Sequence, residues 1–151
     1  MINSSPLYTL NGIVEAPDPE VAKLLLTVHE GPIDQDNAFT LYQPDGPKLA
    51  LRGGPDTFTG GIADDPNGLH VEVDRARRMV AVQGQWWFRG ECRVEPHPRG
   101  ARLVQQVLNV AQSKRWMVPL IWLQTGAQHK AGAEKLLERV GERLGCRAYV
   151  E

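Results

Sequence analysis

The 151-residue sequence is poor in cysteine and carries almost no excess charge. Its two cysteines, Cys92 and Cys146, lie far apart and neither belongs to a Cys-x-x-Cys pair, which argues against a disulfide framework and a structural zinc site. The formal net charge of -1 gives no general attraction to nucleic acid or to an anionic membrane. We therefore expect free thiols, a cytoplasmic protein and no nucleic-acid partner.

Long hydrophobic runs are also missing. The longest, such as residues 118–123, are far too short to cross a bilayer. The first six residues lack both the basic stretch and the apolar stretch of a signal peptide. The sequence thus predicts no integral membrane segment.

Motifs for common catalytic and cofactor chemistry are absent as well. Neither Gly-x-x-x-x-Gly-Lys-Ser/Thr nor Gly-x-Gly-x-x-Gly occurs, so the glycine pairs belong to loops. No Gly-x-Ser-x-Gly turn is present to expose a nucleophilic serine. The four histidines form no His-x-His pair and no His-Glu-x-x-His motif. We expect no cofactor and no metal.

The N-terminal part predicts a strand followed by a helix. Apolar and polar residues alternate over residues 7–16, as in a half-buried strand. Asp18 is placed to cap a helix, Pro19 suits its first position, and Gly31 with Pro32 would end it. The helix would present one apolar face, made by Val21, Leu24, Leu25 and Val28.

The middle of the chain is rich in Gly, Pro, Asp and Asn, which favours loops and short edge strands over residues 33–68. Short β-like runs occur at residues 38–42 and 48–52. Clearer strands follow at residues 69–73 and 79–83, joined by a turn.

A further strand is expected to start at Gln85 or Trp86, turn at residues 96–100 and return over residues 101–111. Alternation predicts that its inward face carries Trp86, Phe88, Gly90, Cys92 and Val94. The solvent face would carry charged residues, with Trp87 as an exposed or partly covered exception. Trp86 and Phe88 fit either an ordinary core or the wall of a ligand pocket.

The phase of the returning strand, residues 101–111, stays open. Either Gln105 or Gln106 should point inward, and that amide must find a partner, because burying it unpaired costs about 1–3 kcal/mol. A water or a ligand in a cavity would serve as that partner. Of the histidines, His97 lies between two prolines in the turn and is expected to be exposed.

The C-terminal part predicts one long amphipathic helix over Val118–Leu144 that ends at Gly145. Gly126, Gly132 and Gly141 suggest close approach or bending. His129 fits either a packed core histidine or a pocket group suited to proton transfer. The apolar stripe comprises Val118, Ile121, Trp122, Thr125, His129, Ala133, Leu136, Leu137, Val140 and Leu144.

This order of elements resembles the helix-grip fold of the SRPBCC, or START-like, superfamily, which includes the major birch-pollen allergen and the polyketide cyclase/dehydrase group. The resemblance rests on residues 10–17, residues 93–103 and the closing helix. It implies an α+β fold in one domain, residues 1–151, with a curved antiparallel sheet wrapped around a long C-terminal helix. In that family a cavity lies between sheet and helix.

Three functions are compatible with these features. The first is binding of a hydrophobic or amphipathic small molecule, with Trp86, Phe88, Gln105, Trp122 and His129 as ligand-binding residues. The second is a polyketide aromatase/cyclase- or dehydrase-like enzyme in which His129 moves protons. The third is a protein-interaction module with an exposed patch around Trp87 or Trp116. The chain could be a monomer or a homodimer.

Overall fold

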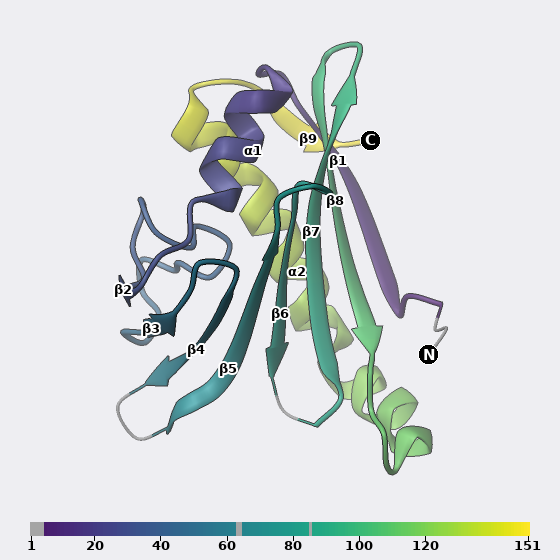
Figure 1. Ribbon diagram of the computed structural model, residues 1–151. Helices are drawn as coiled ribbons and strands as arrows, with labels where there is room; N and C mark the ends of the chain where they lie inside the picture. The colour runs from purple at the N-terminus through teal and green to yellow at the C-terminus, as the bar shows by residue number, and fades with distance from the viewer. Residues whose placement is uncertain (1–4, 63–64, 85) are drawn as a thin grey trace.

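The computed structural model describes residues 5–62, 65–84 and 86–151. Within these residues nine strands form one antiparallel sheet in the order β2-β3-β4-β5-β6-β7-β8-β1-β9, and a long helix, α2, lies against it (Figure 1). The strands are β1 (Tyr8–Val14), β2 (Gly31–Pro32), β3 (Ala50–Gly53), β4 (Thr57–Ile62), β5 (Asp65–Asp74), β6 (Met79–Gly84), β7 (Phe88–His97), β8 (Gly100–Asn109) and β9 (Ala148–Val150). The helices are α1 (Asp18–Leu26), the 3-10 turn η1 (Arg115–Met117) and α2 (Val118–Leu144).

The arrangement confirms the predicted α+β helix-grip fold. Strand β8 pairs with β7 on one side and with β1 on the other, and β9 follows α2 to close the sheet beside β1. Gly100, at the turn of the β7–β8 hairpin, has φ +135°, and a Cβ there would lie 2.5 Å from the Ala16 carbonyl oxygen. Only glycine fits this turn, so it fixes how closely the hairpin approaches the chain that enters α1.

Helix α2 has the predicted bounds. Pro119 lies in its first turn, where its missing N–H costs no hydrogen bond, and Gly145 ends it in the left-handed conformation with φ +66°. All ten residues of the predicted stripe are buried or half-buried. The stripe therefore faces the sheet along the length of the helix.

Three hydrophobic clusters fill the space between the layers. The first joins α1, the C-terminal half of α2 and the upper parts of β1, β7 and β8, and includes Val14, Leu25 and Leu137. The second lies under β3 to β6. The third gathers Trp87, Val107, Ala111 and Val118 near the start of α2.

The first helix and the loop after it differ from expectation. The Asp18 carboxylate does not cap α1 but pairs with Arg78 on the β5–β6 turn, and α1 ends at Leu26, before Gly31. Residues 38–42 form turns rather than a strand. Ala38 has φ +54°, which breaks an extended run, and the buried Asn37 side chain binds the backbone of His29 and Pro32.

The two tryptophans before β7 are placed opposite to expectation. The strand begins only at Phe88, so strand alternation does not apply to Trp86 and Trp87, which lie in the preceding turn. Trp87 is 2% exposed and packs in the third cluster, whereas Trp86 is 44% exposed. Gln85, the other predicted start, lies outside the described residues.

His97, at the end of β7, was predicted to be exposed but is partly buried. Its Nδ1 accepts a hydrogen bond from the Arg99 amide at 3.1 Å, and its Nε2 lies 3.6 Å from a carboxylate oxygen of Glu151. Glu151 continues the pairing of β9 with β1, and its carboxylate lies beside the His97 ring.

Candidate functional site

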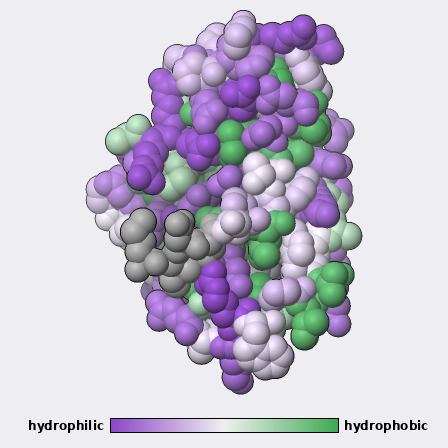
Figure 2. All heavy atoms as spheres, turned by 90° about the vertical axis from the view of Figure 1, so that its right-hand side faces the viewer, coloured by the Kyte–Doolittle hydropathy of each residue, from purple (hydrophilic) through white to green (hydrophobic). Residues whose placement is uncertain are grey.

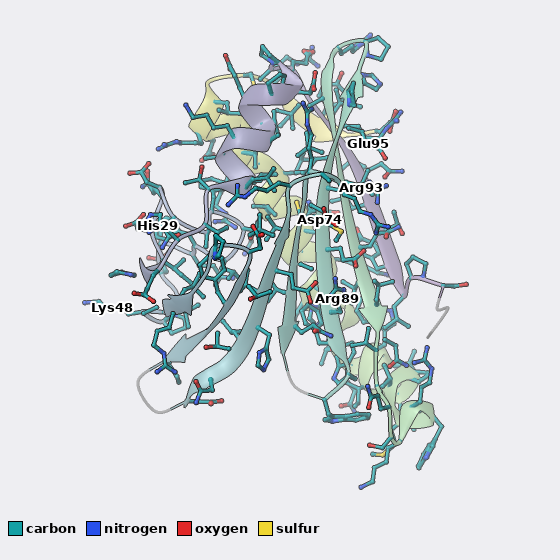
Figure 3. All side chains as sticks on the ribbon, in the orientation of Figure 1. His29, Lys48, Asp74, Arg89, Arg93 and Glu95 are labelled. Carbon is teal, nitrogen blue, oxygen red and sulfur yellow. The ribbon has the colours of Figure 1, made fainter. Side chains whose placement is uncertain are left out.

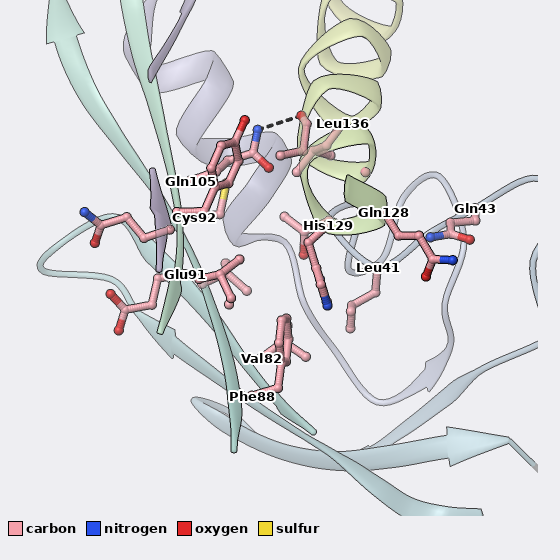
Figure 4. Close-up of a pocket in the computed structure, with 18 of the residues that line it drawn as sticks. Leu41, Gln43, Val82, Phe88, Glu91, Cys92, Gln105, Gln128, His129 and Leu136 are labelled. Carbon is pink, nitrogen blue, oxygen red and sulfur yellow. Dashed lines mark hydrogen bonds between the residues drawn. The ribbon is translucent and has the colours of Figure 1, made fainter. Parts of the chain in front are cut away.

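A cavity of about 410 Å³ lies between the inner face of the sheet and α2 (Figure 4). It occurs where the three hydrophobic clusters approach one another without merging. Cys92 and Leu136 contribute from the first cluster, Val80 from the second, and Val107 from the third. Both layers of the fold therefore line one partly enclosed, mainly apolar space of the size that small ligands occupy.

One end of the cavity is aromatic. The His129 ring stacks on Phe88, with ring centroids 5.1 Å apart, and on Trp122, at 5.5 Å. Trp87 meets His129 edge-on at 6.1 Å. Two turns of α2 and the start of β7 thus hold a four-ring group.

The surroundings of His129 in this group favour its neutral form. Burial lowers its pKa below the usual value near 6.5, because the charged form loses water. Across the described residues, neither ring nitrogen has a hydrogen-bond partner from the protein. Figure 4 shows the ring pointing toward the space beside Val82 and Phe88, so a nitrogen is available to a molecule in the cavity.

Gln105 resolves the open phase of β8. Leu103, Gln105 and Val107 face the helix, and the Gln105 side-chain amide donates to the Ala133 carbonyl of α2 at 2.9 Å. The partner that the Gln105 amide requires is thus a backbone carbonyl of α2. Gln106 instead directs its amide toward the hydroxyl of Thr9 on the neighbouring strand β1, at 3.4 Å.

The opposite side of the cavity is polar. Arg139 of α2 donates to the Tyr42 carbonyl, and its guanidinium carbon lies 5.6 Å from the centre of the Phe39 ring. Burial lowers the pKa of Arg139. Between these two loop residues lies Thr40, whose hydroxyl is buried without a hydrogen-bond partner among the described residues.

Three of the five predicted ligand residues, Phe88, Gln105 and His129, line this cavity. Trp122 stands behind His129 rather than in the wall, and Trp86 does not reach the cavity. Their role in binding stays a prediction. Sequence reasoning missed Arg139 and Thr40, although position 139 follows Leu136 of the stripe at helical spacing of three and could have been included.

The outer surface bears on the interaction hypothesis. Trp87 is buried and cannot form a contact patch, but Trp116 is 71% exposed and Leu123 is 81% exposed. Figure 2 shows apolar side chains gathered toward the lower end of that face, over the start of α2. On the outer face of β7 the charged residues lie as predicted, with Arg89 2.8 Å from Glu91 and Arg93 2.9 Å from Glu95 (Figure 3).

The remaining predictions concern thiols, metals and membranes. Cys92 and Cys146 are both free thiols. In the parts of the chain that the structure describes, no three His, Cys, Asp or Glu side chains come together to hold a metal ion. None of the described helices combines the length and apolar character needed to cross a membrane.

The similarity of this chain to known proteins is confined to solved structures. No protein-family description matches the chain, and no curated protein sequence matches it. Among solved structures it is similar to the Zhui aromatase/cyclase from Streptomyces sp. R1128, with 13% sequence identity and a TM-score of 0.39. The similarity covers 94% of this chain and 96% of that one.

Proposed function

We propose that this protein binds a hydrophobic or amphipathic small molecule in the cavity between the sheet and α2. The observation that carries the proposal is the cavity of about 410 Å³ at the centre of the fold, with apolar walls from both layers and a few polar groups. Protein interiors are normally packed to near crystal density, whereas here the side chains of both layers leave a partly enclosed, mainly apolar space between them. That is the usual form of a small-molecule pocket.

The test uses the neutral fluorescent probe N-phenyl-1-naphthylamine and a cavity-filling variant. Ala133 lines the cavity, so Ala133→Phe would place a ring in it. Ala127 is an exposed residue on the same helix, and Ala127→Phe serves as the matched control. We expect saturable probe binding to the wild-type protein and to Ala127→Phe, and at least a tenfold weaker affinity for Ala133→Phe.

Native mass spectrometry of the gently purified protein, beside a denatured sample, complements this titration. A reproducible extra mass that is lost on denaturation would supply the natural occupant. Probe binding that is unchanged in Ala133→Phe, or no saturable binding to the wild-type protein, would refute the proposal.

A second function, proton transfer by His129, has one supporting observation. Its ring lines the cavity, burial favours the neutral form, and among the described residues no group hydrogen-bonds to its nitrogens, as a general base requires. No carboxylate that would orient the ring is found beside it in the described structure, which makes binding the stronger proposal. If the captured occupant is turned over, His129→Gln should abolish turnover with binding retained; unchanged turnover would remove this function.

A further inference from the structure

The Arg139 guanidinium, on the polar side of the cavity, is partly desolvated and has no counter-ion among the described residues. Arg139 is half-buried, and in the described residues no carboxylate lies within ion-pair distance of it. Glu142 acts on it only through its field. By contrast Arg143, one turn along on an exposed face, lies 2.7 Å from Asp36. A charge that has lost part of its hydration is stabilised by a counter-ion, so the Arg139 guanidinium would favour an anionic group in the cavity.

A second, independent group indicates the same need. The Thr40 hydroxyl is buried, lines the same cavity and has no partner among the described residues. Thr40 lies between Phe39, over which the Arg139 guanidinium is placed, and Tyr42, whose carbonyl accepts from that guanidinium. The loop contacts therefore bring the unpaired hydroxyl and the guanidinium to the same side of the cavity.

The guanidinium retains donors for a ligand. It carries five N–H groups, and the contact with Tyr42 involves only one of its terminal nitrogens. Guanidinium groups and carboxylates form short, charge-assisted hydrogen bonds, often two at once. A hydroxyl donor beside them would complete the coordination of a group with two oxygens.

The rest of the wall constrains the other end of the ligand. Val82, Phe88 and Leu136 offer apolar surface, and the stacked Phe88 and His129 rings lie at the end of the cavity nearest the start of β7 (Figure 4). We propose that the ligand is an amphipathic acid whose carboxylate binds Arg139 and Thr40, while its apolar body lies against β6 to β8. This inference rests on the proposed function and names the ligand class for that site.

Matched probes test the carboxylate by itself. Isothermal titration calorimetry would compare 2-naphthoate with 2-naphthalenemethanol, and dodecanoate with 1-dodecanol. Each pair keeps one apolar body and exchanges an acid for an alcohol, so the two pairs also separate aromatic acids from fatty acids. We expect at least one acid to bind about ten- to a hundredfold more tightly than its alcohol, the range of a charged hydrogen bond.

Variants locate the preference in the protein. Arg139→Gln should remove the preference for the acid and leave the affinity for the alcohol unchanged. Arg143→Gln, on the same helix but outside the cavity, is the control and should bind as the wild type does. Thr40→Val keeps the shape and should weaken the acid several-fold. If circular dichroism shows that Arg139→Gln does not fold, Thr40→Val decides, and an unchanged acid preference in it overturns the inference.

The remaining outcomes separate this inference from the proposed function. Equal affinity for acid and alcohol in the wild type, or an acid preference that survives in folded Arg139→Gln, overturns the inference alone. If N-phenyl-1-naphthylamine binds but neither acid binds more tightly than its alcohol, the inference is overturned and the proposed function stands. If neither the neutral probe nor any member of the pairs binds, the proposed function fails and the inference fails with it.

Discussion

Gly12 of β1 packs directly against Leu137 of α2. A Cβ at Gly12 would lie 2.5 and 2.6 Å from the two terminal carbons of Leu137 and 3.1 Å from its Cγ. Carbon atoms attract best at about 3.5–4.0 Å, so an alanine would force the helix or the leucine to move by roughly an ångström. Leu137 is only 2% exposed and cannot swing into solvent.

We therefore expect Gly12→Ala to lower the free energy of unfolding. Overpacking of this kind costs about 1–3 kcal/mol. The alanine also restricts the unfolded chain, which offsets the loss by about 0.4–1 kcal/mol. With both ranges at their midpoints, the net loss is about 1 kcal/mol, measured by urea unfolding followed by tryptophan fluorescence.

A double-mutant cycle tests the cause. Leu137→Ala by itself should cost about 2–5 kcal/mol through the cavity it leaves. In the double variant the new methyl group enters that space, so the two costs should not add, and the coupling should be about 1–3 kcal/mol. Gly132→Ala is the control, because nothing lies within 4 Å of its Cβ position, and helix propensity should stabilise it by up to about 1 kcal/mol. Additive single costs would refute the steric explanation.

Three further predictions follow from buried polar groups. Burial lowers the pKa of His129 in the folded protein below the unfolded value near 6.5, so the unfolded chain takes up its proton first as the pH falls. The free energy of unfolding should therefore decrease as the pH drops through about 6.5. Urea unfolding at several pH values should show this decrease in the wild type, and His129→Gln should lack this component of it. Burial raises the pKa of the Cys92 thiol to about 12, so iodoacetamide at pH 8 should modify the less buried Cys146 first by intact mass; equal rates would mean that solvent enters freely at Cys92. Asn37→Ala should cost on the order of 3 kcal/mol, because it leaves backbone groups of His29 and Pro32 unpaired, and Asn37→Asp, which retains only the acceptor, should not restore the loss.

The parts of the fold that sequence could predict are those with strong periodicity and clear ends. Helix α2 shows a stripe of ten residues, a proline in its first turn and a glycine just after its end, and each of these signals is local. Strands β5 and β6 alternate cleanly and share a tight turn, so they too were found, although β5 begins earlier than expected. Which side chains of β8 face inward depends on the hydrogen bond from Gln105 to the Ala133 carbonyl of α2, and no local sequence pattern reveals that contact.

The errors arise where a turn replaces a strand. Alternation was extended back to Trp86, but β7 begins at Phe88, and the large Trp87 ring is buried by the start of α2, far along the chain. Arg139 was overlooked because an arginine beside an apolar stripe usually reaches solvent. Its burial depends on Phe39 and Tyr42, which lie in the loop whose local sequence pattern is the weakest.

The cavity itself follows from side-chain size along α2. From Leu136 to Val140 the helix presents large residues that fill the gap to the sheet, but one turn earlier it presents Gly132 and Ala133. A small residue has no fixed meaning: at Gly141 a Cβ would lie 2.8 Å from that of Ala148 on β9, whereas at Gly132 it would meet nothing within 4 Å. The first glycine permits close packing, and the second has no protein neighbour beside it. The residues that face the helix across the layers decide between these roles. A sequence can therefore predict that a helix packs on a sheet without predicting whether a cavity remains between them.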